Sequence, residues 1–270
     1  MLRYGRFSFV EAKNEEIKKK IYQLRYEVYV KEFGFEKPED HPGGLETDEY
    51  EKYSKHFAAI DDDGEVIGTI RLVLCSEKGF PIEHATKVSF IGEKPPPEKI
   101  AEISRLAVSK KYRRRREDGM FGVESYLKKS EGGILPDSGP VPRKHERRKR
   151  PVIVLGLFQI MYHASKRLGL SHWYMITEKK IYYMLKKFGF LFHQIGEPVE
   201  YHGLRIPYLG IINEIEQDLI RENPVFLKMI LRGLEKKYHP EYGAVNLLKM
   251  YLAFPYYSKK ALRYWQGIRR

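Results

Sequence analysis

The chain has 270 residues, 42% of them hydrophobic and 13% aromatic, with a formal net charge of +13 and one cysteine, Cys75. Composition and length indicate a globular protein, either one large α/β domain with an appendage or two small domains, and exclude an intrinsically disordered chain. The single cysteine excludes a disulfide framework and a cysteine metal site, and the lack of a signal-peptide pattern or of an apolar run of roughly 18 residues predicts a cytoplasmic protein.

Hydrophobic periodicity in the first half of the chain alternates between strand and helix patterns. The tract 61–64, Asp-Asp-Asp-Gly, predicts a hairpin turn rather than a calcium loop, for which it is too short. Cys75 ends the apolar run that starts at Ile70, so a buried thiol is expected. The expected elements, in chain order, are a strand at 6–10, an amphipathic helix at 13–33, a loop at 35–51, strands at 56–60 and 66–74, a loop closed by three prolines at 95–97, and a central strand at 99–108.

The second half opens with a basic stretch at 112–150, rich in glycine and proline, that we interpret as a long insertion. A helix follows it, and Gly169 is the natural C-cap of that helix. The pattern as a whole predicts an α/β protein with a mixed sheet and helices over its faces. The remaining expected elements are a helix at 152–168, a strand at 173–176, a helix at 179–187, strands at 190–195 and 205–209, and a helical tail from about 216.

The positive charge is concentrated in two zones. Residues 110–150 contain 14 Lys and Arg against 6 Asp and Glu, and residues 216–270 contain 11 against 5. Such zones suit an acidic partner, which could be nucleic acid, an anionic membrane surface or an acidic protein. Nucleic acid is not expected, because no recognition helix or RNA-binding signature is present. The tail is expected to pack on the domain, with peripheral contact at the inner membrane face as the alternative.

Charged residues occur inside strands that are otherwise apolar. Arg71 lies within the strand at 66–74, Glu102 and Arg105 lie within the central strand, and Arg25 interrupts the apolar stretch of the first helix. Charges in such places are costly unless they are paired. We therefore expect one network in which the three arginines face acids; the alternative is a set of separate solvated charges. The expected acidic partners are Glu46, Asp48 and Glu102.

Glu102 and Arg105 are three residues apart, so a regular strand would point them to opposite faces. A β-bulge between them would bring both side chains to one face and free a backbone N–H for a ligand. The sequence therefore predicts a bulge in the central strand.

This set of residues resembles the acyl-homoserine-lactone autoinducer synthases, and still more closely the N-acyl amino acid synthases and the PEP-CTERM/exosortase-associated acyltransferases. The resemblance covers roughly residues 5–215. It implies the GNAT fold, with a mostly antiparallel mixed sheet and helices on both faces, over residues 1–215, followed by a helical extension at 216–270. The motifs that carry it are Arg25, Glu46-x-Asp48-x-x-Glu51, Arg71, Glu102-x-Ser104-Arg105 to Val108, Tyr112-Arg113-Arg114-Arg115, His172-Trp173-Tyr174 and the run 198–203.

The resemblance implies an N-acyltransferase with no tightly bound cofactor and no metal. It would move a fatty acyl group from the thioester of an acidic acyl carrier protein, or of coenzyme A, directly to the amine of an amino acid or a related molecule. A carboxylate must take a proton from the amine, and donors must stabilise the oxyanion. The expected roles are proton transfer by Glu46, Asp48 and Glu102, acceptor binding and positioning by Arg25, Arg71, Ser104 and Arg105, and donor binding by Leu106, Ala107, Val108, Arg113, Arg114 and Arg115.

Three departures from the family pattern narrow this expectation. The stretch 33–36, Phe-Gly-Phe-Glu, lacks the tryptophan of autoinducer synthases, which puts S-adenosylmethionine as the acceptor in doubt. The stretch 110–116 is basic and has no Gly-x-Gly, which favours a carrier-protein donor over free coenzyme A. Leu185 stands where many GNAT enzymes have a tyrosine acid. The alternatives are an autoinducer synthase that uses S-adenosylmethionine and a non-catalytic module that binds an acyl carrier or a membrane surface.

Overall fold

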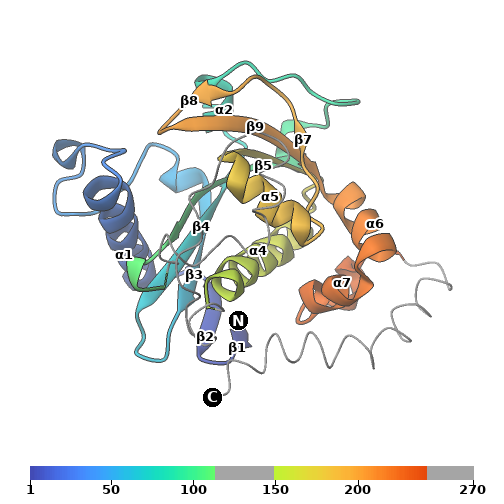
Figure 1. The fold of residues 1–270 in the computed structure, drawn as a ribbon, viewed down its shortest axis with the longest axis horizontal. Helices are drawn as coiled ribbons and strands as arrows, with labels where there is room; N and C mark the ends of the chain where they lie inside the picture. The colour runs from blue at the N-terminus through green and yellow to red at the C-terminus, as the bar shows by residue number, and fades with distance from the viewer. Residues whose placement is uncertain (113–148, 242–270) are drawn as a thin grey trace, which may run out of the picture.

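A computed structural model describes residues 1–112 and 149–241 of the chain (Figure 1). One nine-stranded sheet runs through it in the order β1-β2-β3-β4-β5-β6-β9-β7, with β8 paired to β9. Among the described strands only β5 and β6 run parallel, which confirms the mostly antiparallel mixed sheet expected from the sequence. The strands are β1 (Leu2–Tyr4), β2 (Phe7–Glu11), β3 (Ser54–Ile60), β4 (Val66–Leu74), β5 (Ile100–Val108), β6 (His172–Thr177), β7 (His193–Gln194), β8 (Val199–Glu200) and β9 (Leu204–Ile211).

Helices cover both faces of this sheet. The longest of them, α4, packs on β2, β3 and β4, where Gly156 contacts the ring of Phe9 so closely that a Cβ there would lie 2.4 Å from it. On the other face, α1 packs against Ala58 and Ala107. The helices are α1 (Glu15–Arg25), α2 (Pro81–Ala85), α4 (Lys149–Arg167), α5 (Lys179–Lys187), α6 (Ile212–Glu222) and α7 (Pro224–Leu231), and α1 continues as the π-helical segment Tyr26–Glu32.

The parallel pair β5·β6 separates halfway along its length. Pairing begins at Ile100 opposite His172 and stops at Ile103 opposite Met175, although β5 continues to Val108. Beyond this point β5 remains paired only with β4. Because alternate N–H groups of a strand point to opposite edges, part of the backbone of 104–108 faces the gap between β5 and β6. This gap places an open strand edge in the middle of the sheet.

Several local expectations differ from the structure. The first helix changes to π-helical hydrogen bonding at Tyr26, and a short strand, β1, precedes the expected one. The expected strand at 190–195 is only two residues long, as β7. Cys75 is exposed, so the expectation of a buried thiol was wrong, because β4 ends at Leu74 and the chain leaves the sheet there. The hairpin turn is confirmed, with the Asp61 carboxylate accepting from two backbone N–H groups of the turn.

The segment after β9 folds back onto α4. Gln159 of α4 is 2% exposed. Its amide nitrogen donates to three backbone carbonyls at the C-terminal end of α7, those of Met229 (2.9 Å), Ile230 (3.1 Å) and Arg232 (3.0 Å). Its amide oxygen accepts from the Tyr4 hydroxyl at 2.6 Å. Residues 212–239 are therefore packed on the sheet domain, whereas the tail beyond 241 and the domain division at 215/216 stay predictions. No helix in the described ranges is long and apolar enough to cross a membrane.

This bonding pattern predicts that Gln159→Leu destabilises the protein by about 3 kcal/mol. The substitution keeps the side-chain size but removes the hydrogen bonds that the buried Gln159 amide makes with the carbonyls at the end of α7 and with the Tyr4 hydroxyl. Urea unfolding would measure the loss, with Gln194→Leu, at an exposed position, as the matched control. A loss for Gln159→Leu no larger than that of the control would contradict the prediction.

Candidate active site

Three arginines and three acids form a closed ring of ion pairs, which we call the ion-pair ring. Each acid bridges two of the arginines. Arg25 and Arg71 are buried, Glu46 is fully buried, and the Arg105 side chain is 15% exposed. The contacts are Arg25 Nε with Glu46 Oε2, Arg25 Nη2 with Glu51 Oε1 (2.8 Å), Arg71 Nη1 with Glu51 Oε1 (2.9 Å) and Asp48 Oδ1 (2.6 Å), and Arg105 with Asp48 Oδ2 (3.1 Å) and Glu46 Oε1 (2.9 Å).

The expected network therefore forms, but its membership differs from the prediction. Glu51, which the motif includes without an assigned role, joins the ring, and its Oε2 lies 2.9 Å from Nε2 of the buried His56. Glu102 makes no direct ion pair with the ring arginines; its carboxylate instead accepts from the backbone N–H of Ile82 at 2.8 Å. Glu102 pairs differently because α2 lies over it and supplies the Ile82 N–H, whereas the loop that carries Glu46 supplies the acids that pair with the arginines.

Local structure explains how each arginine reaches the ring. Arg25 is the last residue of α1, and the loop is held beneath it by a hydrogen bond from the Glu46 N–H to the carbonyl of Tyr22 at 3.1 Å. Arg71 of β4 is fixed from the side by Ser104 of β5, whose hydroxyl accepts from its Nε at 2.9 Å. Ser104 therefore acts on the neighbouring arginine.

The expected bulge is present, and it lies at Arg105 itself. Thr69 of β4 is opposite Ala107, while Arg71 is opposite Ser104, so β5 contains one extra residue in this interval. Arg105 has a φ of +49°, a conformation that costs a non-glycine residue on the order of 1–3 kcal/mol. Its two ring carboxylates offset that cost, and the bulge brings the Arg105 side chain to the face that Arg71 uses.

The pKa values of the acids in the site are shifted in opposite directions. Burial alone would raise the pKa of Glu46, Asp48 and Glu51, but the adjacent arginines outweigh burial and hold all three below their ordinary values. In Glu102 burial prevails over the Ile82 N–H and over Arg71 and Arg105, and it raises the pKa to about 8. The ring acids are thus ionised at neutral pH, whereas Glu102 is mostly protonated there and releases its proton in mildly alkaline solution.

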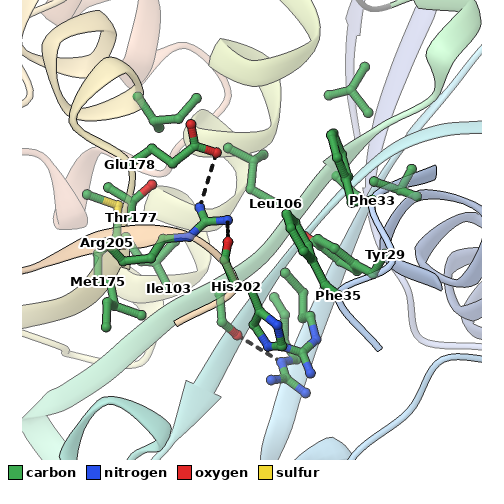
Figure 2. A pocket seen from close by; sticks show the side chains of 18 of the residues that line it. Tyr29, Phe33, Phe35, Ile103, Leu106, Met175, Thr177, Glu178, His202 and Arg205 are labelled. Carbon is green, nitrogen blue, oxygen red and sulfur yellow. Dashed lines mark hydrogen bonds and ion pairs between the residues drawn. The ribbon is translucent and has the colours of Figure 1, made fainter. Parts of the chain in front are cut away.

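A pocket of about 1520 Å³ joins the ion-pair ring to the gap between β5 and β6 (Figure 2). Asp48, Arg71, Ser104, Arg105 and the residues 106–108 line it, together with Glu102. Arg25 and Glu46 lie behind this wall and do not line the pocket. The predicted donor residues Arg113, Arg114 and Arg115 lie outside the described residues, so their role stays a prediction.

The side of the pocket toward α1 is aromatic. The rings of Phe33 and Phe35 stack with centroids 5.0 Å apart and planes 11° apart, and Phe35 also stacks on Tyr29. His202, from the turn between β8 and β9, contacts Phe35, and Arg205 holds that turn by donating to the carbonyl of His202 at 2.9 Å. Figure 2 shows Tyr29, Phe33 and Phe35 on one side of the cavity and Met175 and Arg205 on the other. In the described ranges no group of three His, Cys, Asp or Glu side chains could hold a metal ion.

The raised pKa of Glu102 predicts a specific pH dependence of stability for Glu102→Gln. The ordinary pKa is 4.5 and the folded value about 8, so between these pH values the unfolded chain releases a proton that the folded protein keeps. Wild-type stability therefore falls as pH rises from about 4.5 to 8. The variant lacks this titration and should gain about 3–5 kcal/mol relative to wild type between pH 5 and pH 9 in urea unfolding.

Glu93→Gln, at an exposed loop position, is the control for this measurement and should show the same stability difference from wild type at both pH values. A Glu102→Gln difference that does not change with pH would show that Glu102 titrates normally.

Comparison with known proteins places this geometry in context. Residues 24–121 match the sequence family described as an acetyltransferase (GNAT) domain. The chain is similar to TofI, solved in a ternary complex with an inhibitor and MTA, with 18% identity over 86% of this chain and 99% of that chain and a TM-score of 0.54. It is also similar to BjaI, a CoA-dependent acyl-homoserine lactone synthase solved with SAM and isopentyl-CoA, with 17% identity, 92% and 99% coverage and a TM-score of 0.53.

A more distant similarity is to FeeM, an N-acyl amino acid synthase from uncultured soil microbes, with 12% identity, 79% and 94% coverage and a TM-score of 0.46. No curated protein sequence matches the chain. The resemblance to PEP-CTERM/exosortase-associated acyltransferases finds no support in these matches and stays a prediction. Residues 24–121 therefore match an acetyltransferase (GNAT) domain, in agreement with the acyltransferase class expected from the sequence, and the chain has the fold of the acyl-homoserine lactone synthases, which confirms the expected fold.

Proposed function

We propose that the protein transfers a fatty acyl group from a thioester donor to the amine of an amino acid or a related small molecule. The observation that carries this proposal is Glu102: a buried carboxyl group with a pKa near 8 that lines the pocket beside the open edge of β5. A general base is most effective when its pKa is near the working pH. Glu102 meets that condition, and it lies in the pocket where a donor thioester and an acceptor amine can meet.

In the proposed reaction the acceptor amine is neutral, having lost its ammonium proton to solvent, and ionised Glu102 takes one N–H proton from it as the nitrogen attacks the thioester carbon. The carbon–nitrogen bond forms, and the carbonyl electron pair moves to oxygen. Collapse of this intermediate breaks the carbon–sulfur bond, and the departing thiolate receives the proton from Glu102. Backbone N–H groups of 106–108 on the open edge of β5 would stabilise the oxyanion. The products are an amide and a free thiol.

The ring acids suit a structural role better than proton transfer. Both oxygens of Glu46 are taken by Arg25 and Arg105, and Asp48 accepts from Arg71 and Arg105. A carboxylate held this way is a weak base. We therefore assign positioning of the pocket wall to Glu46 and Asp48, and proton transfer to Glu102.

The acceptor is proposed to be an amino acid bound near Arg105. Arg105 is the ring arginine with the most exposed side chain, and it lines the pocket beside Tyr29 and Glu36. A guanidinium group at this place suits an acceptor carboxylate. The competing candidate is S-adenosylmethionine, which was bound in the similar structure of BjaI. The stacked rings of Phe33 and Phe35 occupy the stretch that lacks the expected tryptophan, which favours the smaller acceptor.

The donor is proposed to enter at the lysine-rich end of the pocket. Lys110 and Lys111, which follow β5, line the pocket together with Lys180 of α5, and the basic tract 113–116 comes next in the sequence after Tyr112. Lysines at this end suit the phosphate of a phosphopantetheine arm, and the adjacent tract suits an acidic carrier protein. A non-catalytic module would share these charges but would not require a buried carboxyl group of raised pKa.

We expect kcat/KM for acyl transfer to rise with pH and to level off above about pH 8, because Glu102 must be ionised to accept the proton. Glu102→Gln should lower the rate by at least about 10²-fold and remove this limb of the profile. The assay would mix the purified protein with acyl donors and a panel of amino acids, amines and S-adenosylmethionine, and detect the products by mass. Release of a homoserine lactone would favour the autoinducer synthase, and no product from any pair would refute the enzyme.

Donor choice gives a separate prediction. With one acyl chain on both carriers, kcat/KM should be higher for the acyl carrier protein than for coenzyme A and should fall with salt. Replacing Arg113, Arg114 and Arg115 by serine should lower the carrier-protein value by about 10-fold and affect coenzyme A less. Lys259→Ser with Lys260→Ser, in the second basic zone, is the control. Equal loss with both donors would assign these arginines to a contact common to both, rather than to the carrier protein.

A further inference from the structure

Tyr29 is a pocket residue for which the sequence offered no role. It lies four residues after Arg25 on the same face of the first helix, inside the π-helical segment Tyr26–Glu32. Tyr29 lines the pocket together with the buried Val28, whereas the buried Val30 does not. Insertions of π-helical hydrogen bonding are frequent at functional sites. The segment thus brings a phenol group to the pocket wall.

Contacts on two sides fix the Tyr29 ring. Phe35 stacks on it with centroids 6.3 Å apart, and the Arg105 guanidinium lies 5.7 Å from its centroid. The backbone also closes around it, because the Phe35 N–H donates to the Tyr29 carbonyl at 2.7 Å. Figure 2 shows the ring extending from the α1 side into the cavity, beside Phe35 and toward Leu106 of β5. These contacts therefore hold the Tyr29 hydroxyl in one position.

Nothing in residues 1–112 or 149–241 forms a hydrogen bond with this hydroxyl. Among the buried tyrosines, Tyr4 donates to Gln159, Tyr112 to Asp61 and Tyr162 to Glu216. A fixed phenol that faces a pocket with its donor unused is suited to a ligand atom. Burial raises the pKa of Tyr29 against the lowering effect of Arg105 and Arg25, so the group is protonated and can donate at neutral pH.

We propose that the Tyr29 hydroxyl is a catalytic hydrogen-bond donor to the oxyanion of the acyl-transfer intermediate. It would complete, from the α1 side, the set of donors that the backbone of 106–108 supplies from β5. No proton leaves Tyr29 in this step: the amine proton passes to Glu102 and then to the thiolate. The proposal rests on the function proposed above, and it gives that site a side-chain donor where Leu185 leaves the usual tyrosine position of GNAT enzymes empty.

The test is Tyr29→Phe, which removes one oxygen and keeps the ring. Because the donor acts on charge that exists only in the transition state, kcat should fall by about 10²-fold while KM for donor and acceptor changes less than about 2-fold. Tyr29→Met, which also lacks the hydroxyl, should show the same loss. Tyr26→Phe, in the same π-helical segment but outside the pocket lining, should keep wild-type kcat. Thermal unfolding of Tyr29→Phe and Tyr26→Phe should match the wild type to within a few degrees, whereas Tyr29→Met, which loses the ring contacts with Phe35 and Arg105, should unfold at a lower temperature.

Three results would overturn the proposal. One is an unchanged kcat in folded Tyr29→Phe. A second is an effect confined to the KM of the acceptor, which would make Tyr29 a binding residue. The third is an equal loss in Tyr26→Phe, which would make the effect structural. A wild-type protein without transfer activity would overturn the proposed function together with this inference, whereas an active wild type with an unimpaired Tyr29→Phe would overturn this inference alone.

Discussion

The burial or partial burial of six charges in one closed ring is the constraint on which the site depends. Each guanidinium and carboxylate loses hydration on folding, and only complete mutual pairing offsets that cost. Each acid therefore has to bridge two arginines, and the three arginines come from α1, β4 and β5. Removing one member takes one of two counter-charges from each of its neighbours and leaves the ring with an unbalanced charge. The ring thus fixes the first helix and the acidic loop against the middle of the sheet more strictly than apolar packing would.

The same constraint accounts for the open strand edge beside the ring. Arg105 reaches Glu46 and Asp48 only because β5 has an extra residue there and Arg105 adopts a positive φ. The bulge increases the local twist of β5, and pairing with β6 has already stopped at Ile103. The bulge that places a third arginine on the face of Arg71 therefore lies beside the gap that a donor thioester would need.

Part of this site could be predicted from the sequence and part could not. Arg71 and Arg105 are visible because a charge within an apolar strand requires a partner. Glu51 could be named as part of the acidic motif but not given a role, and Tyr29 could not be singled out, because a loop carboxylate and a helical tyrosine look ordinary until long-range contacts bring one to the ion-pair ring and the other to the pocket. The charge of Glu102 suggested an ion pair. In the structure α2 lies over Glu102, no cation pairs directly with it, and burial raises its pKa, which the sequence could not reveal. The exposed Cys75 is a similar case, since one residue beyond a strand end changes burial.

These features divide the pocket into two electrostatic parts. The ion-pair ring contains equal numbers of cations and anions, so its field largely cancels within a few ångströms. Protonated Glu102 and neutral Tyr29 add no net charge at neutral pH. The other charged side chains that line the pocket nearly balance in number, and a local positive field is expected where Lys110 and Lys111 follow the end of β5. These side chains are Lys31, Lys110, Lys111, Lys180 and Arg205 on one side of the balance and Glu32, Glu36, Glu49 and Glu178 on the other. An anionic donor would be drawn to that end, which leaves its acyl group in the neutral part, where hydrogen-bond donors act in a low dielectric and have their largest effect on developing charge.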